Sequence, residues 1–322
     1  MSGVNFVLVY SDTTSIPSNS GPVTSNQGFN VPSGPCDELV FRITTANSSG
    51  AVVADFGNIM SALRVVINGT QCFDFRSGYA SASNNAPSQF NYFLNSLGMG
   101  RASEIPGDTA KEVLYRIPIG RNLPGDSVSR VEFQLEYAQT ASAVASGSLE
   151  VFIRYNSAMT NTTTVSNATS FTASGTTENL VVRLPAGVPG VVAGIMIQND
   201  SASDQFDSVR LISQSDFSLP KGLLRAYNGD TMNGILYADD GVSTTQQTYA
   251  LTVAGGLFLP TFGLTTDDDI RLTLTSTAST TFTFTPVLVA PINASKESRG
   301  TQTQAVVTNV GDAVLAGSSE NV

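Results

Sequence analysis

The chain has 322 residues, of which 41% are hydrophobic and 13% charged, so it is long enough for two domains and too apolar to be disordered. It contains no histidine, which excludes Ser-His-Asp and Cys-His catalysis and every metal site that needs a histidine ligand. The formal net charge is -10 and the arginines are scattered singly, which argues against direct packaging of nucleic acid.

The N-terminal half predicts short strands joined by turns, because Ser, Thr, Asn and Gly are abundant. Residues 1–34 predict an N-terminal arm that holds a first strand: the apolar run 4–9 precedes a polar segment, 11–34. Residues 35–157 predict the first β unit. Its strand candidates lie at 39–44, 51–56, 63–67, 71–75, 112–117, 129–137 and 149–155.

A helix is expected inside this first unit, after the Pro-Ser pair at 87–88. Apolar residues recur there at the helical spacing i, i+3, i+4 and i+7, and Gly98 follows as a stop signal: Phe90, Phe93, Leu94 and Leu97. We expect this helix to cover the open end of the first barrel. A lid over a ligand is the alternative.

The second half begins after a Thr/Ser/Asn-rich segment, 158–177, which predicts a linker between domains. Residues 178–292 predict a second unit of the same kind, and 293–322 predict a polar C-terminal tail. Strand candidates in the second unit lie at 180–184, 191–198, 209–212, 223–226, 249–253, 270–275 and 281–289.

The two halves also resemble each other in sequence. Four pairs of similar short runs occur in one order, at offsets between 141 and 146 residues: Leu39 with Leu180, Arg64 with Arg210, Pro118 with Pro260, and Arg130 with Arg271. One pair alone is weak, but four in order predict a duplicated unit. The predicted fold class is therefore all-β, with two tandem eight-stranded jelly rolls and a short helix in the first.

Candidate sites for chemistry are few. The acidic run of Asp267, Asp268 and Asp269 could supply oxygen ligands to calcium, and a solvated loop is the alternative. The run 98–103 lacks the third glycine of a dinucleotide loop and no Walker-type motif occurs, so we expect no cofactor and no catalytic residue. A glycosidase needs two carboxylates and stays open as an alternative, although the sequence contains no Trp to line a sugar cleft.

Two cysteines in 322 residues do not form a disulfide scaffold, so Cys36 and Cys72 are expected to be reduced and buried as small apolar residues. The sequence shows no apolar run of membrane-spanning length and no basic, apolar secretion signal at its start. We therefore expect the protein to be made soluble in the cytoplasm.

The duplicated pattern, with a helix in the first unit and polar segments at both ends, resembles the double jelly-roll major capsid proteins of tailless icosahedral viruses. In size and in its Ser/Thr/Asn-rich composition the chain is similar to the compact capsid proteins of small phages with an internal membrane, such as the Flavobacterium-infecting lipid-containing phage. The resemblance extends over nearly all of the chain and depends on the four paired runs, since no diagnostic motif carries it.

This resemblance implies a structural protein, not an enzyme, that forms homotrimers in the shell of the virion. Its partners would be other copies of itself, a vertex or penton protein and an internal lipid membrane, without direct contact to nucleic acid. Membrane contact would come through a few basic residues such as Lys111, Lys221 or Lys296. The alternative from another class is a two-domain receptor-binding or lectin-like phage spike protein.

Overall fold

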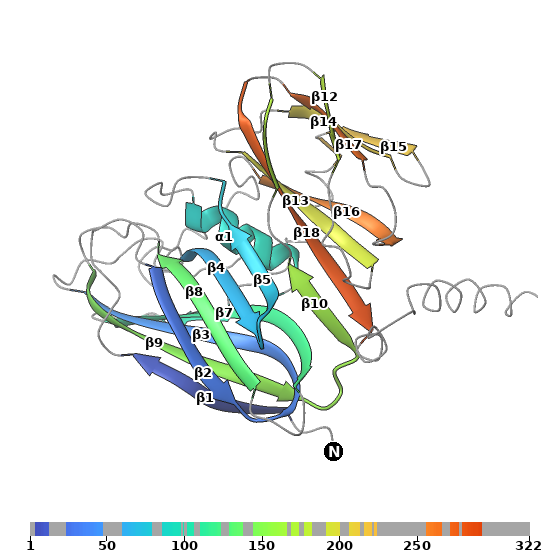
Figure 1. Ribbon diagram of the computed structural model, residues 1–322. Helices are drawn as coiled ribbons and strands as arrows, with labels where there is room; N and C mark the ends of the chain where they lie inside the picture. Colours follow the sequence, from blue (N-terminus) through green and yellow to red (C-terminus); the bar gives the residue numbers. More distant parts are fainter. Residues whose placement is uncertain are drawn as a thin grey trace, which may run out of the picture.

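The computed structural model describes residues 4–12, 24–47, 60–78, 86–97, 99, 102–105, 110–123, 129–137, 144–165, 169–173, 177–181, 191–199, 206–212, 216–220, 222–223, 256–265, 271–276 and 279–291. Antiparallel strands account for nearly all of the regular structure in these ranges, and they form two barrels that lie side by side (Figure 1). The all-β prediction is confirmed.

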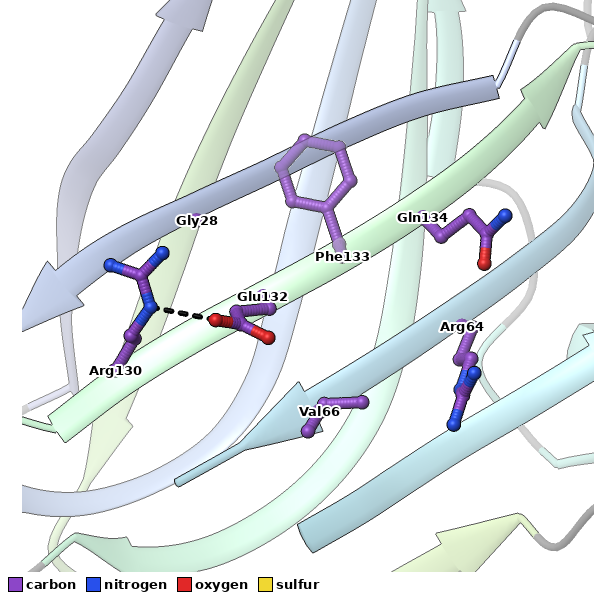
Figure 2. A pocket seen from close by; sticks show the side chains of 7 residues that line it. All are labelled: Gly28, Arg64, Val66, Arg130, Glu132, Phe133 and Gln134. Carbon is purple, nitrogen blue, oxygen red and sulfur yellow. Dashed lines mark hydrogen bonds and ion pairs between the residues drawn. The ribbon is translucent and has the colours of Figure 1, made fainter. Parts of the chain in front are cut away.

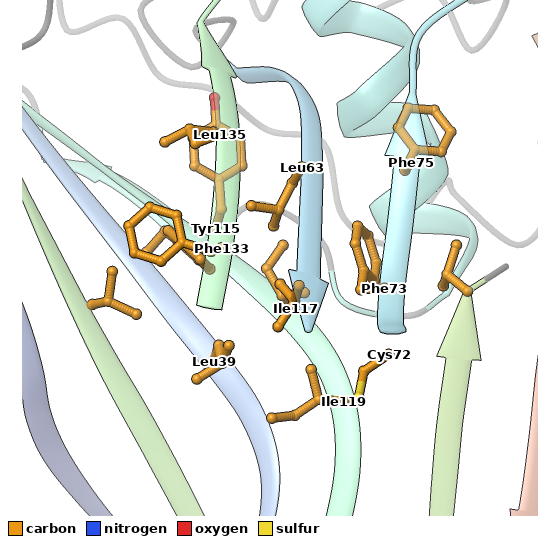
Figure 3. Packing of buried hydrophobic residues seen from close by; sticks show 14 of the residues in the cluster. Leu39, Leu63, Cys72, Phe73, Phe75, Tyr115, Ile117, Ile119, Phe133 and Leu135 are labelled. Carbon is orange, nitrogen blue, oxygen red and sulfur yellow. The ribbon is translucent and has the colours of Figure 1, made fainter. Parts of the chain in front are cut away.

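The first barrel is built from two facing sheets, ordered β1-β9-β3-β7-β6 and β2-β8-β4-β5. The interior side chains of both sheets form one core (Figure 3). Its strands are β1 (Val4–Asp12), β2 (Thr24–Val31), β3 (Gly34–Asn47), β4 (Met60–Ile67), β5 (Thr70–Arg76), β6 (Ala102–Ile105), β7 (Ala110–Leu123), β8 (Ser129–Tyr137) and β9 (Val144–Asn156).

The second barrel follows the same plan, with sheets ordered β10-β18-β13-β16 and β12-β17-β14-β15. A further strand, β11, pairs with β18 beyond the end of β10. The strands are β10 (Asn161–Val165), β11 (Thr169–Thr172), β12 (Thr177–Val181), β13 (Val191–Asn199), β14 (Phe206–Ile212), β15 (Asp216–Pro220), β16 (Gly256–Thr265), β17 (Arg271–Ser276) and β18 (Thr281–Pro291).

The two barrels share one strand order. In one pair of sheets β1, β9, β3 and β7 correspond to β10, β18, β13 and β16, and in the other pair β2, β8, β4 and β5 correspond to β12, β17, β14 and β15. A bulge recurs as well. It falls between Cys36 and Glu38 in β3 and between Val192 and Gly194 in β13. The bulges occupy one position, since Glu38 pairs with Pro118 and Gly194 with Pro260. The predicted tandem jelly rolls are confirmed.

Three of the four predicted sequence pairs fall on equivalent strands. Arg64 and Arg210 lie in β4 and β14, Pro118 and Pro260 in β7 and β16, and Arg130 and Arg271 in β8 and β17. The pair of Leu39 and Leu180 is wrong, because Leu39 lies in β3 and Leu180 in β12. Leu39 corresponds to Ile195, since each is paired with the residue just before the equivalent proline. An apolar run that includes an arginine fits any half-buried strand, which explains the misalignment.

The expected helix forms as α1 (Ala86–Ser96) and packs beside β4 and β5. Phe90 and Phe93 are fully buried, and the ring of Phe93 stacks on Phe75 with centroids 4.3 Å apart. Such an aromatic pair stabilises beyond its buried area by about 1 kcal/mol. The helix therefore extends the first core sideways, toward the second barrel (Figure 1).

Two boundaries differ from the prediction. The segment 11–34, expected as an arm or a long loop, contains β2, an edge strand whose Phe29 and Val31 are buried. The expected linker 158–177 contains β10 and β11 and the start of β12. Their Thr-rich sequences lack an apolar period, but β-branched Thr is suited to strands. The strand candidates 51–56 and 249–253 and the tail 293–322 lie outside the described residues.

Candidate functional site

The two barrels meet at a junction formed by α1, the end of β5 and the sheet of β10, β18, β13 and β16 (Figure 1). At its centre is Gln89 of α1, which is fully buried. Its Oε1 accepts hydrogen bonds from Ser77 Oγ and Gly78 N at 2.9 Å and from Gln198 Nε2 at 3.0 Å. Its Nε2 donates to the carbonyl oxygen of Asn199 at 3.0 Å, so one amide joins both barrels.

The backbones approach closely beside this amide. A Cβ on Gly78 would lie 3.1 Å from the Asn199 carbonyl oxygen and 3.3 Å from Gln198 Cβ. Tyr92 of α1 is also buried, and its hydroxyl accepts a hydrogen bond from the Phe258 amide at 3.3 Å. The helix is thus tied to β13 and to β16 of the second barrel.

A second contact joins β10 to β7. Gly120 has φ of 36°, and a Cβ there would lie 2.5 Å from the carbonyl oxygen of Asn161. The next residue, Arg121, donates to the Thr163 carbonyl at 3.2 Å and to the Thr164 hydroxyl. Glycine is required here both for the left-handed backbone and for the close approach of β10.

Apolar side chains of the second barrel complete the junction. Val165, Met196 and Val287 come from β10, β13 and β18, yet they are buried in the hydrophobic core cluster of the first barrel. They lie on the outer face of their own sheet, while its inner face packs on the second core. The barrels therefore share buried apolar surface.

The equivalent outer face of the first barrel, which we call the β1 face, is formed by β1, β9, β3 and β7. Phe6 and Leu8 of β1 are 54% and 49% exposed, the highest values among the described large apolar side chains of this face. Beside them lies an ion-pair network of Asp37, Glu38, Arg116 and Arg154. The Arg154 guanidinium binds Asp37 at 2.6 and 2.8 Å and Glu38 at 2.8 Å.

Burial would raise the pKa of Asp37, but hydrogen bonds from Arg154 and Asn156 outweigh it and hold this pKa below its ordinary value. The same hydrogen bond from Arg154 to Asp37 raises the pKa of the guanidinium. Both groups are therefore charged at neutral pH. The network balances two carboxylates against two guanidinium groups, so it offers no unpaired charge to a ligand.

A hollow of about 460 Å³ lies on the outer face of the sheet β2-β8-β4-β5 (Figure 2). It is lined by Gly28, Arg64, Val66, Arg130, Glu132, Phe133 and Gln134. Arg130 pairs with Glu132 at 2.7 Å, and Arg64 lies 3.9 Å from Asp74. These exposed pairs contribute little energy and do not converge on one point, so the hollow has no arrangement for catalysis.

Most of the residues singled out from the sequence fall outside the part of the chain that the structure describes. Asp267, Asp268, Asp269, Lys221 and Lys296 lie outside the described residues, and Lys111 lies in β7 with its side chain undescribed. Among the described side chains, no group of three or more His, Cys, Asp or Glu could hold a metal. The helices within the described ranges are all too short or too polar to cross a membrane.

The prediction for the cysteines is confirmed. Cys36 and Cys72 are free thiols, both buried in the first core. Burial raises the pKa of Cys36 to about 12, so its thiol is protonated and unreactive in the folded protein.

Sequence reasoning missed Gln89, Gly120 and Arg121, the residues that hold the junction. A signal for Gln89 existed, because it lies four residues before Phe93 on the apolar side of the helix, where a polar residue needs a buried partner. For the pair of Gly120 and Arg121 the sequence carries no comparable signal.

No protein-family model and no curated protein matches the sequence. Solved structures do match. The major capsid protein of Sulfolobus turreted icosahedral virus aligns at TM-score 0.59 and 10% identity, over 92% of this chain and all of that one. The fold is the double jelly roll. A chain in the atomic structure of the same virus aligns at TM-score 0.58 and 12% identity, over 95% of this chain and 96% of its own.

Proposed function

We propose that this protein is a major capsid protein, and that three copies form a pseudo-hexagonal trimer that tiles an icosahedral virion shell. The observation that carries the proposal is the pair of barrels with one strand order, held in one orientation by the junction. The fold it shares with the Sulfolobus virus capsid protein supports the same role. Three chains supply six similar barrels around one axis, so identical chains give a block with a hexagonal outline.

The rigidity of the junction is what such a block requires. A flexible link between the barrels would let each trimer adopt many outlines. Fixing one outline in the lattice would then cost conformational entropy and weaken assembly. The shared core and the Gln89 amide remove that freedom before assembly.

The remaining partners follow from this role. A pseudo-hexagonal trimer does not fit a five-fold axis, so the vertices require a separate vertex or penton protein. An internal lipid membrane separates the shell from the genome in this proposal, and the net charge of -10 supports the absence of direct contact with nucleic acid. Basic side chains such as Lys111, Lys221 or Lys296 would make the contact with lipid. The role is structural, without enzymatic activity.

Copy number in the purified particle tests the proposal. A major capsid protein dominates a stained gel of the particle, whereas a receptor-binding spike is present in a few dozen copies. Dominance of this chain supports the capsid role, and a minor band would favour the spike. In solution, mass photometry of released capsomers should give about 101 kDa, the mass of three chains of 33.7 kDa.

A further inference from the structure

Because the chain is a duplication, each position of one barrel has an equivalent in the other, fixed by strand pairing. Glu38 and Gly194 are equivalent through their prolines, which makes Arg42 of β3 the equivalent of Gln198 in β13. On the other sheet, Arg64 of β4 aligns with Arg210 of β14. Arg64 pairs with Asp74 and Arg210 with Ser218, so Gly78, four residues after Asp74, is the equivalent of Gly222, four residues after Ser218. Each residue at the junction can therefore be compared with its equivalent on the other barrel, where the surface is open.

The first open surface is the β1 face. Its equivalent in the second barrel is covered: Val165 and Val287 are 0% and 1% exposed because the first barrel packs on them. The equivalent residues of the first barrel are Phe6 and Arg154, which the register aligns opposite each other. Phe6 is 54% exposed, since nothing in the described chain packs on this face as the first barrel packs on the second.

The second open surface follows β15. At the end of β5, Gly78 lies against the second barrel, with only 3.1 Å left for a Cβ. Gly222 is the equivalent glycine at the end of β15, and nothing in the described chain lies within 4 Å of where its Cβ would be. Its neighbour Leu223 is 54% exposed, as Phe6 is. The described part of the chain therefore has both halves of a junction, one on each barrel, and does not join them to each other.

We propose that a second copy of this chain joins them: the end of β15 in one copy, at Gly222 and Leu223, docks on the β1 face of the next. This inference rests on the proposed capsid trimer and assigns its contact surface. The contact repeats the junction within the chain, so barrels alternate around a ring, and the ring closes after three copies.

The chemistry of the two contacts suits their different histories. The junction within the chain forms once, on folding, and is apolar with a buried amide. The β1 face must be compatible with water before assembly, and its charges are already paired with one another. They form the network of Asp37, Glu38, Arg116 and Arg154 and the ion pair of Arg42 with Glu150 at 2.7 Å. Docking against it covers the apolar rim of Phe6 and Leu8 and leaves no charge without a partner.

A disulfide between copies tests the contact directly. The Cβ of Gln198 lies 3.3 Å from the place of a Cβ on Gly78, close to the roughly 3.5–4.5 Å of a disulfide. The equivalent pair between copies is Arg42 and Gly222. The double variant Arg42→Cys, Gly222→Cys, mildly oxidised, should give covalent dimers and trimers on a non-reducing gel and no larger species. Cys36 and Cys72 do not compete, because both are buried.

Each single variant is a control and should give no closed trimer. If the unoxidised double variant is a trimer by mass photometry but does not cross-link, the contact surface is wrong and the capsid proposal stands. A ladder that continues beyond three chains would contradict the closed ring. If the unsubstituted protein does not form trimers at all, the proposed function fails before the contact is tested.

Discussion

The substitution Gln89→Leu tests whether the junction couples the two barrels. Leucine has a similar volume and helix propensity, so the change removes the amide and little else. It deprives Ser77 Oγ, the Gly78 amide, Gln198 Nε2 and the Asn199 carbonyl of one hydrogen bond each. A lost buried hydrogen bond costs about 1–3 kcal/mol, and partial relaxation reduces the sum, so we expect a loss of about 3–6 kcal/mol.

The loss should appear as uncoupling as well as destabilisation. Urea unfolding is followed by far-ultraviolet circular dichroism and by tyrosine fluorescence, since the sequence has no tryptophan. The unsubstituted protein should unfold in one transition, and the variant in two, with the second barrel melting at lower urea. Gln134→Leu, on the partly exposed outer face of β8, is the matched control and should change stability by less than about 0.5 kcal/mol. A loss below about 1 kcal/mol for Gln89→Leu, with one transition, would refute the assigned role.

Three further outcomes are expected. Gly120→Ala should destabilise the protein by about 2 kcal/mol or more in urea titrations, because the added Cβ meets the backbone of β10. The control Gly69→Ala has φ of 78° but open space in the described chain, so it should show only the backbone cost of about 1 kcal/mol, and equal losses for the two variants would contradict the close approach at Gly120. The pKa of Cys36 is about 12 in the folded protein, against an ordinary value of 9.0, so the stability that the buried thiol contributes is complete below pH 9 and is lost as pH rises toward 12, by at most about 1.4 kcal/mol per pH unit. Cys36→Ala should flatten this dependence of unfolding free energy on pH, and an unchanged slope would assign it to other groups. Purified capsomers should not bind labelled single- or double-stranded DNA at about 150 mM salt, and salt-sensitive micromolar binding would argue for direct contact with the genome.

The sequence by itself determined the features that depend on local periodicity. Alternation along β8 gave its bounds to the residue, and the i, i+3, i+4 pattern of Phe90, Phe93 and Leu94 predicted α1. The pairs Arg64 with Arg210 and Pro118 with Pro260 identified the duplication, because equivalent strands keep similar residues at similar spacing. Burial of the cysteines followed from their number and their apolar character.

Only the tertiary structure decided which polar segments become strands and which polar residues are buried. The strands β2 and β10 have no apolar period, and backbone pairing with β8 and β18 holds them in place. The role of Gln89 depends on Asn199, and that of Gly120 on Asn161, each more than forty residues away in the sequence. A polar or glycine residue acquires such a role only when folding brings a distant backbone within hydrogen-bonding or van der Waals distance, and no local pattern in the sequence records that distance.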